Sequence, residues 1–403
     1  MRVAGVICEY NPFHTGHAWQ LAELRRCGAE AVVCAMSGNF VQRGDFAVVR
    51  KHARAEAAVC GGADLVLELP LPWATASAEA FARGGVEVLA GTGVVDTLAF
   101  GSECADTARL MRAADCLRSD GFAEALRAEL SRGDSFASAR QRAAETMLGA
   151  DAACLGEPND ILGVEYCKAL RTLESGIVPL ALPRVGAAHD GGAAGEYASA
   201  SYIRERLLSD GGADALKSCL TPDMLRLFEA ERAVGRAPVR AAAVERAILA
   251  KLRAMREEEL AAYDDGGEGL YHRFFDAGRT AVSVEGLLGA VKTKRYAHAR
   301  LRRLLLAVYL GVLPEERTQP VPYLRVLAMN DKGKYLLHEM RKKASLPVLV
   351  KPADVRELPP PAQRLMETEA RATDLYALAY PDLARGAGGS EWTTNPVIVG
   401  GEG

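Results

Sequence analysis

Short apolar runs alternate with amphipathic stretches through the first half of the chain. The run Val3 to Cys8 leads into a proline-containing turn, and Ala18, Leu21, Ala22 and Leu24 then recur at helical spacing. This pattern predicts a strand, a tight turn and the start of a helix.

Four further apolar runs predict strands, and the stretches between them predict helices. The strands are expected at Ala31 to Met36, Asp64 to Leu69, Thr97 to Phe100 and Val178 to Leu182. Strands that are covered on both faces lose the alternation of apolar and polar residues, as these runs do. Because strands alternate with helices, we expect an α/β fold built on a doubly wound parallel sheet.

From Thr221 onward the pattern becomes almost entirely helical. Pro238 to Tyr263 predicts one long charged helix, and Tyr296 to Leu310 predicts another. Tyr323 to Met329 is a candidate for a short strand. The last stretch, Gly386 to Gly403, predicts a loosely ordered tail.

A glycine-containing polar stretch from Ser209 to Ala215 predicts a linker. We therefore expect two domains, with the sheet in residues 1–212 and a mainly helical domain in residues 213–403. The segment Gly186 to Ala198 is rich in glycine and alanine and has no periodicity, so we expect a mobile loop there.

Composition places the chain among soluble globular proteins. Of its 403 residues, 49% are hydrophobic and 25% are charged, and no apolar run is long enough to span a membrane. We therefore expect no membrane contact and a cytoplasmic location. Nine cysteines without a CxxC pair favour reduced thiols over a disulfide framework or a zinc site, so no structural metal is expected.

Charge is unevenly distributed along the chain. The net charge is −3, but Lys292 to Lys343 holds 13 Lys and Arg against four acidic residues, a local excess of +9 that leaves −12 for the remainder. Such a zone suits an anionic polymer such as RNA, although a solvated helix face is the commoner meaning of a charge run. The candidate RNA-binding residues are Lys292, Lys294, Arg295, Arg302 and Arg303.

The turn after the first strand carries the clearest chemistry. His14 and His17 flank Gly16 where a helix is expected to begin. Ligands of open α/β sheets bind at the carboxyl ends of strands, and a helix N-terminus favours phosphate. Imidazole N–H groups can donate to phosphate oxygens and stabilise a departing pyrophosphate. The alternative is two surface histidines beside an ordinary turn.

Two loops are further candidates for ligand contact. Ser37 to Gly44 carries Asn39, Gln42 and Arg43, which could hold a phosphate or a polar base edge, although an ordinary glycine-containing loop is an equal alternative. Gly101 follows the fourth strand at the ligand edge of the sheet, where a plain turn is the alternative.

The longer string around the histidines is similar to a known family. His-Thr-Gly-His after an N-terminal strand resembles the nucleotidylyltransferase superfamily, whose HxGH signature and Rossmann-like fold are shared with class I aminoacyl-tRNA synthetases. Within it, the chain resembles the tRNA(Met) cytidine acetate ligases. The matching stretches are Ile7 to His17, Met36 to Gly44, Ala63 to Pro70, Phe100 to Glu103 and Lys292 to Tyr296.

The resemblance implies a set of site residues. The segment from Ser199 to Leu207 is similar to the serine-rich segment that closes the phosphate site, so Ser201 is expected to cap a helix and face phosphate and Arg204 to clamp the anion; a capped surface helix is the alternative. The family favours a second asparagine where Asp160 stands, and an aromatic within Gly186 to Asp190. The implied ATP contacts are Ile7, Cys8, Glu9, Tyr10, Asn11, Pro12, Phe13, His14, Thr15, Gly16, His17, Ala18, Trp19, Gln20, Gly101, Asn159 and Arg184.

The implied reaction has two steps. Acetate attacks the α-phosphate of ATP to give acetyl-adenylate and pyrophosphate, and the N4 amine of the wobble cytidine of elongator tRNA(Met) then attacks the acetyl carbon. Mg²⁺ is a candidate companion of ATP. Two alternatives remain open from the residues: an adenylyltransferase that acts on a small phosphorylated acceptor, and a non-catalytic RNA-binding protein that senses ATP. The basic helical half argues against the first, and His14 and His17 argue against the second.

Overall fold

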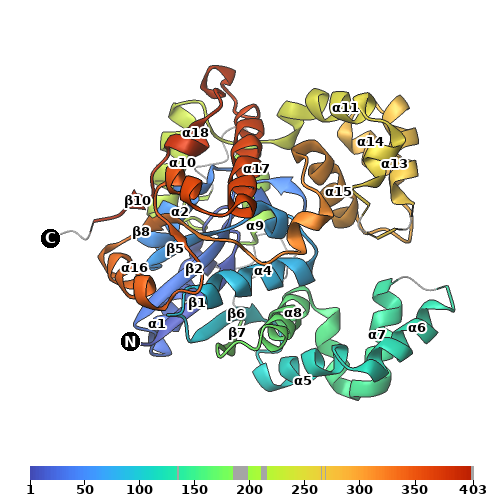
Figure 1. Cartoon of the computed structure of the whole chain (residues 1–403), viewed down its shortest axis with the longest axis horizontal. Coiled ribbons are helices and arrows are strands. Elements are labelled where there is room, and N and C mark those ends of the chain that lie inside the picture. The colour runs from blue at the N-terminus through green and yellow to red at the C-terminus, as the bar shows by residue number, and fades with distance from the viewer. Residues whose placement is uncertain (134–135, 185–197, 210–215, 265, 268, 401–403) are drawn as a thin grey trace.

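The computed structural model describes residues 1–400 except 134–135, 185–197, 210–215, 265 and 268. A central sheet of eight strands runs through the molecule, in the order β10-β8-β5-β2-β1-β6-β7, with β9 paired to β8 (Figure 1). The strands are β1 (Val3–Cys8), β2 (Ala31–Ser37), β5 (Leu65–Leu69), β6 (Thr97–Ser102), β7 (Val178–Pro183), β8 (Leu324–Met329), β9 (Val348–Leu349) and β10 (Val397–Ile398).

The five strands predicted in the first half are confirmed, and they run parallel to one another. β1 lies in the middle, paired with β2 from Val3 opposite Ala31 to Cys8 opposite Met36. Its residues alternate between two cores: Val3 and Ile7 face one, and Ala4, Val6 and Cys8 face the other. The sheet is therefore doubly wound, as its unbroken apolar strands indicated.

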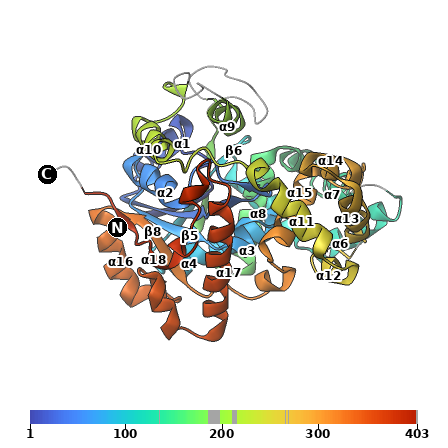
Figure 2. The ribbon, with the colours of Figure 1, turned by 90° about the horizontal axis from the view of Figure 1, so that it is seen from above.

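Helices cover both faces of the sheet (Figures 1 and 2). One face packs against α4 (Ala78–Gly91), α5 (Thr107–Leu117), α8 (Pro158–Thr172), α16 (Asp331–Lys343) and α17 (Pro360–Ala377). The other packs against α1 (Thr15–Arg26), α2 (Lys51–Cys60), α9 (Ala200–Leu208) and α10 (Pro222–Ala233). The remaining short or peripheral helices near these layers are α3 (Leu71–Ala74), α6 (Asp120–Leu130), α7 (Phe136–Leu148) and α18 (Ser390–Thr393).

The candidate strand at Tyr323 to Met329 is confirmed as β8, but it belongs to the central sheet. β8 pairs antiparallel with β5, so the sheet is mixed and not wholly parallel as expected. β10 then pairs parallel with β8. The edge of β5 would otherwise expose unpaired backbone groups, and β8 covers it. Residues beyond 213 thus complete the sheet, and the expected division into two domains stays a prediction.

A third core joins the second half of the chain to a small hairpin. It contains apolar residues of α11 (Glu245–Ala254), α12 (Glu257–Ala261), α13 (Leu270–Thr280), α14 (Val284–Val291) and α15 (His298–Leu310), together with Phe40 and Phe46. Those two residues belong to the antiparallel hairpin of β3 (Phe40–Val41) and β4 (Asp45–Phe46). The helices therefore pack on the loop that the sequence marked as a candidate ligand contact.

The single long helix expected from Pro238 to Tyr263 is wrong. The chain forms a short 3-10 turn (Ala241–Val244), then α11 and α12, with an extended break at Met255. The Glu259 carboxylate accepts a hydrogen bond from the Arg256 backbone N–H (2.8 Å), which starts the second helix. This capping signal outweighs the continuous amphipathic pattern.

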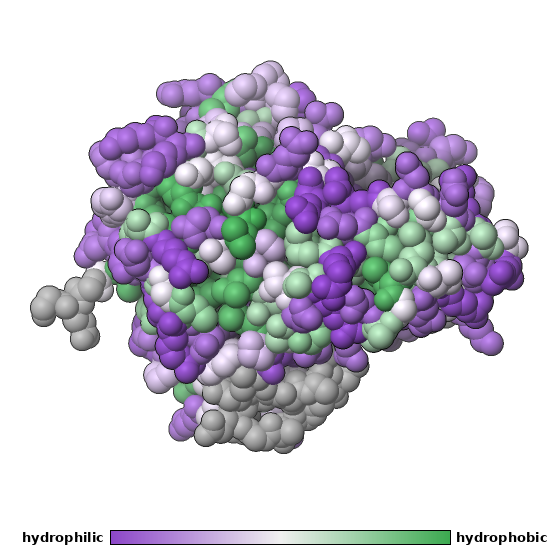
Figure 3. Space-filling view, turned by 90° about the horizontal axis from the view of Figure 1, so that it is seen from below, coloured by the Kyte–Doolittle hydropathy of each residue, from purple (hydrophilic) through white to green (hydrophobic). Residues whose placement is uncertain are grey.

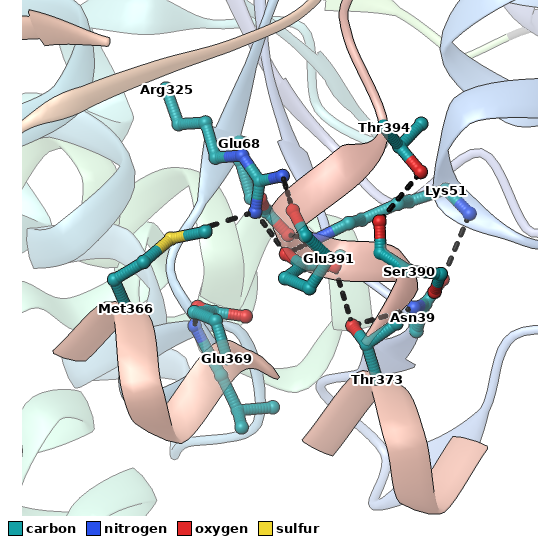
Figure 4. A network of polar contacts seen from close by, with 12 residues as sticks. Asn39, Lys51, Glu68, Arg325, Met366, Glu369, Thr373, Ser390, Glu391 and Thr394 are labelled. Atoms are coloured by element: carbon teal, nitrogen blue, oxygen red, sulfur yellow. Dashed lines mark hydrogen bonds and ion pairs between the residues drawn. The ribbon is translucent and has the colours of Figure 1, made fainter. Parts of the chain in front are cut away.

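A buried network of ion pairs ties the end of the chain to the sheet (Figure 4). Lys51 of α2 contacts Glu68 of β5 (2.6 Å) and Glu391 of α18, and Arg325 of β8 contacts both carboxylates. Glu391 is 1% exposed. The stretch from Gly386, predicted to be loosely ordered, is therefore held in place by α18 and β10 up to residue 400.

The network contains a third carboxyl group. Burial, followed by the nearby charge of Glu68, raises the pKa of Glu369 to about 8, so this group is protonated at neutral pH. Its Oε1 accepts the Leu71 backbone N–H. Lys51 and Arg325 then balance the charges of Glu68 and Glu391.

Two observations describe the surface. Figure 3 shows the face seen from below, where hydrophobic residues gather toward the middle among hydrophilic ones. Within the described residues, no helix is both long and apolar enough to cross a membrane.

We predict that Glu391→Gln destabilises the fold by about 3–5 kcal/mol, because the buried cations Lys51 and Arg325 would then share the single negative charge of Glu68. The free energy of unfolding in urea measures this change. The matched control is Glu357→Gln, since Glu357 is exposed and should leave stability unaltered. Equal stability of the two variants would contradict the prediction.

Candidate functional site

A cavity of about 360 Å³ opens at the carboxyl end of β1, the central strand. The start of α1, the hairpin β3–β4, the end of β6 and the starts of α8 and α9 surround it. Part of its wall is apolar, formed by Ile7, Phe81, Phe100, Leu162 and Leu182. The position agrees with the ligand edge expected for an open α/β sheet.

The two histidines form a capping box at the start of α1. The Nδ1 atom of His14 accepts the Gly16 backbone N–H (3.1 Å), and the Nδ1 atom of His17 accepts the His14 backbone N–H (3.3 Å). Because each Nδ1 is an acceptor, the proton of each neutral ring sits on Nε2. The rings stack with centroids 3.7 Å apart and line the cavity, where they offer two N–H donors.

Their surroundings keep both rings neutral. Burial, then the charges of Arg184 and Arg204, lowers the pKa of His14 to about 4. Burial lowers the pKa of His17 well below its usual value, and His14 and Arg184 add to the effect. Both histidines are therefore uncharged hydrogen-bond donors at neutral pH.

Cationic and polar side chains complete the rim. Arg204 lines the cavity and donates to the Asn11 carbonyl oxygen (3.0 Å). Glu103 links two predicted ATP contacts, since it accepts from the Asn159 amide (2.6 Å) and pairs with Arg184 (3.5 Å). Arg184 and Asn159 both line the cavity.

The role expected for Ser201 is wrong in part. Ser199 is the N-cap of α9, and its hydroxyl accepts the Tyr202 backbone N–H (3.2 Å). Ser201 is not among the residues that line the cavity, and its hydroxyl accepts from Arg204 (3.0 Å). The helix begins two residues earlier than the motif indicated, so Ser201 positions Arg204 while Ser199 faces the cavity.

Ten of the fourteen residues from Ile7 to Gln20 line the cavity. Pro12, Phe13, Thr15 and Ala18 do not, and contact of ATP with these four residues stays a prediction. Phe13 is fully buried and packs edge-on against Tyr10, and Thr15 donates to the Cys219 carbonyl oxygen (3.2 Å). Phe13 and Thr15 thus anchor the loop to the protein interior.

Gly101 lies at the end of β6 and lines the cavity, as predicted. A Cβ atom built on it would meet no other heavy atom within 4 Å. A side chain at this position would therefore fit the fold and extend into open space.

The polar residues of the candidate loop Ser37 to Gly44 point to two different places, the cavity and the protein interior. Gln42 and Arg43 line the cavity. Asn39 does not; it is buried, and its side chain accepts the Lys51 backbone N–H (2.9 Å) and donates to Thr373 (3.2 Å). Asn39 therefore belongs to the interior, and no local pattern indicated a partner so distant in the chain.

Sequence reasoning missed two residues that shape the site. Arg54 is fully buried in α2 and donates to the carbonyl oxygens of Val49, Glu9, Ser37 and Gly38, which fixes the ends of β1 and β2. The Asp160 carboxylate accepts from the Glu103 (2.9 Å) and Cys104 (3.2 Å) backbone N–H groups and fixes the loop after β6. An arginine in an alanine-rich helix and an aspartate in a first helical turn carry no signal for such contacts.

The basic zone is not one continuous surface. Lys332 to Lys343 lies on α16, and α15 lies on the other side of the molecule (Figures 1 and 2). In the chain, strand β8 of the central sheet separates the two helices. Arg295 precedes α15, which begins at His298 and not at Tyr296, so Arg295 and Arg302 do not lie on one helix. The Lys292 ammonium group donates to the carbonyl oxygens of Thr293 and Tyr296 and holds this turn.

Helix α15 packs against the hairpin that reaches the cavity. Gly44 has a φ of +75°, and a Cβ atom there would lie 2.5 Å from the backbone of Arg302 and Arg303. Gln42 and Arg43, which precede this glycine, line the cavity. None of the five candidate RNA-binding residues lines it. A mobile loop was expected from Gly186 to Ala198. Residues 186–197 of this segment lie outside the part of the chain that the structure describes, so the expectation stays a prediction.

Comparisons with known proteins agree with this geometry. Residues 1–390 match the family model described as HIGH Nucleotidyl Transferase. The chain is 36% identical to the tRNA(Met) cytidine acetate ligase of Acetivibrio thermocellus, over 99% of this chain and 100% of the relative. It is 38% identical to that of Caldanaerobacter subterraneus subsp. tengcongensis, over 95% and 97% of the two chains.

Solved structures show the same similarity. Thermotoga maritima TmcAL bound with alpha-thio ATP superposes with a TM-score of 0.93 at 34% identity, and the apo form with 0.95 at 33%, each over 100% of both chains. The family model, the relatives and the solved structures each match this chain over nearly its whole length. The chain therefore belongs to the tRNA(Met) cytidine acetate ligase family of HIGH nucleotidyl transferases.

Proposed function

We propose that this protein activates acetate with ATP and transfers the acetyl group to N4 of the wobble cytidine of elongator tRNA(Met), releasing AMP and pyrophosphate. The observation that carries the proposal is the pair of stacked, neutral histidines whose Nε2–H groups are available in the cavity. ATP, acetate and tRNA are cytoplasmic solutes, and we place the reaction there.

In the first step, an acetate oxygen attacks the α-phosphorus of ATP, and the bond to the β-phosphate oxygen breaks. The Nε2–H groups of His14 and His17 donate to the phosphate oxygens on which charge grows. Arg184 and Arg204 add positive charge at the rim. Preorganised donors of this kind need no rearrangement as charge develops.

Mg²⁺, if ATP brings it, supplies further charge neutralisation. Among the described residues that line the cavity, only Glu9 carries a carboxylate. The side chains around the cavity thus supply few oxygen ligands, and the phosphates themselves suit this hard cation.

In the second step, the cytidine amine attacks the acetyl carbon of the mixed anhydride. This amine is conjugated with its ring and is a weak nucleophile, so it needs an activated acyl donor. The apolar wall of Phe100, Leu162 and Leu182 limits access of water to the anhydride. Holding the two reactants together in this enclosed space supplies the remaining rate advantage.

We predict that His17→Asn lowers acetate-dependent exchange of labelled pyrophosphate into ATP by about 10²- to 10³-fold, because it removes one donor to the developing charge. The asparagine amide keeps an acceptor near the position of Nδ1 for the His14 N–H, so the cap of α1 persists. Circular dichroism checks the fold. Exchange at the wild-type rate would exclude this role.

We predict that Gly101→Val weakens ATP binding at least tenfold, because its side chain would project into open cavity space without displacing the protein. Titration calorimetry measures the affinity. A thermal unfolding temperature close to that of the wild type is the control for folding. Wild-type affinity in the folded variant would place Gly101 outside the nucleotide site.

We predict that reversing charge at Arg295 and Arg302 weakens tRNA binding, because Arg302 lies where α15 packs against the hairpin and Arg295 lies in the basic turn just before α15. The log–log dependence of affinity on salt should flatten by about 0.7–0.9 for each phosphate that the protein no longer neutralises. Filter binding across a salt series measures both quantities.

The matched control reverses Lys342 and Lys343, an equal change in charge on α16. It should leave tRNA affinity close to that of the wild type. A small-molecule adenylyltransferase predicts no tRNA effect in either variant, and an ATP-sensing RNA-binding protein predicts no pyrophosphate exchange at all. Equal weakening of tRNA binding in both variants would show that α15 is not the specific RNA-binding surface.

A further inference from the structure

We infer that Glu9 marks the subsite for the cytosine base: its carboxylate accepts a hydrogen bond from the N4 amine and takes the proton that this amine loses on acetylation. The inference rests on the proposed function. It assigns the acceptor half of the reaction to a residue that the sequence placed only among the ATP contacts.

Glu9 places a negative charge in a cavity whose other charged side chains are positive. It is the only carboxylate among the described residues that line the cavity, whereas Arg43, Arg184 and Arg204 contribute positive charge there. The substrates of the first step, ATP and acetate, are both anions. The Glu9 carboxylate repels both ATP and acetate and therefore does not help to bind them. We infer that it serves instead to accept a hydrogen bond or a proton from another substrate.

The carboxylate is not neutralised by a close ion pair. Glu9 has no arginine or lysine nitrogen within 4.0 Å among the described residues. Its Oε1 atom accepts the Gln42 backbone N–H (2.7 Å), and Oε2 makes no hydrogen bond to any residue that the structure describes. One oxygen is therefore anchored, and the other remains available to a ligand in the cavity.

Rigid neighbours hold this carboxylate in place. Arg54, fully buried, donates to the Glu9 carbonyl oxygen and also to the carbonyls after β2. Gln42 belongs to the hairpin on which α15 packs. The group is thus fixed between the nucleotide cavity and the helix that carries candidate RNA contacts, where an RNA base must enter to meet the adenylate.

A carboxylate has the chemistry that a cytosine amine needs. Glutamate accepts hydrogen bonds from the cytosine N4–H₂ group, whereas a histidine donor or an arginine cannot. In the transfer step, the N4 lone pair forms a bond to the acetyl carbon, and the carbon–oxygen bond to AMP breaks. AMP leaves with the electron pair, and the N4 proton passes to Oε2 of Glu9.

The surroundings of Glu9 also favour its action as a base. Burial raises the pKa of Glu9, although the Gln42 hydrogen bond and the charges of Arg204, Arg43 and Arg54 oppose the shift. The Tyr166 phenol also lies within electrostatic reach and is un-ionised, because burial raises its pKa well above the usual value. A base must be deprotonated, so acetyl transfer should decline as pH falls through a pKa above the ordinary carboxyl value.

The test uses the full-length protein with Glu9→Gln, which keeps an oxygen for the Gln42 N–H and removes the basic charge. Two rates are measured: acetate-dependent pyrophosphate exchange, and single-turnover acetylation of a tRNA(Met) transcript. We expect the ratio of acetylation to exchange to fall by about 10²-fold or more, the usual contribution of a general base. The acidic limb of the acetylation pH profile should disappear in the variant.

Hydroxylamine provides a second readout on the same variant. It is a strong nucleophile that captures acetyl-adenylate as acetohydroxamate without help from a protein base. We expect hydroxamate formation by Glu9→Gln to fall far less than tRNA acetylation. The matched control is Glu103→Gln, the carboxyl that holds Asn159 and Arg184 at the rim; it should change both rates together and leave their ratio unaltered.

Three outcomes would overturn the inference. Wild-type rates of both exchange and acetylation in Glu9→Gln would show that the carboxylate acts in neither step. A parallel fall of exchange and acetylation would place it in acetate activation, and recovery of both rates at high Mg²⁺ would make it a metal ligand. If the wild-type protein acetylates no tRNA, the proposed function itself fails. That result differs from a failure of the Glu9 inference, which shows only in the comparison of the variants with the wild type.

Discussion

In the first turn of α1, two imidazoles accept hydrogen bonds from backbone N–H groups, and the rest of the site depends on this arrangement. An aspartate cap would satisfy the same N–H groups but would present no hydrogen-bond donor to the cavity. With imidazole, each ring uses Nδ1 to cap the helix and directs its proton to Nε2. Burial then keeps both rings neutral, so they contribute hydrogen bonds without fixed charge.

Helix α2 connects this site to the far edge of the sheet. Its first residue, Lys51, is enclosed by Glu68 and Glu391, and Arg54, one turn later, fixes the backbone at Glu9 and Gly38. The chain end that closes over Lys51 therefore lies only one helical turn from the group that positions the cavity loop. Residues near the C-terminus thus take part in the frame of a site formed by the N-terminus.

The order of the first-half elements could be predicted because each rests on local pattern. The unbroken run Val3–Cys8 and the turn around Pro12 place the histidines correctly without knowledge of any distant residue. The position of β8 against β5 and the burial of Glu391 could not be predicted, because both depend on partners more than 250 residues away. The basic zone counted along the sequence likewise includes both α15 and α16, but in the fold these helices lie on different sides of the molecule.

Local signals also failed where two of them competed. Ser199 and Ser201 both lie at the start of the same helix, and only the backbone conformation decides which one caps it. Glu259 accepts the Arg256 N–H at the start of α12, but arginine is not a residue that marks a helix start, so the longer amphipathic period gave the wrong helix boundary. Such errors shift a boundary by a few residues, which matters most where a side chain must reach a ligand.

The cavity has to meet two opposite electrostatic demands, and the sequence of events can reconcile them. ATP brings several negative charges, which the arginines and the histidine donors accommodate while Glu9 is unfavourable. When pyrophosphate departs, most of that negative charge leaves with it, and the acetyl-adenylate retains a single charged phosphate. A carboxylate is then far less unfavourable beside the nucleotide, and a base that carries hydrogen-bond donors becomes the best complement to it. On the proposed function, the departure of pyrophosphate thus changes the cavity from one that favours anions into one that favours a cytosine amine.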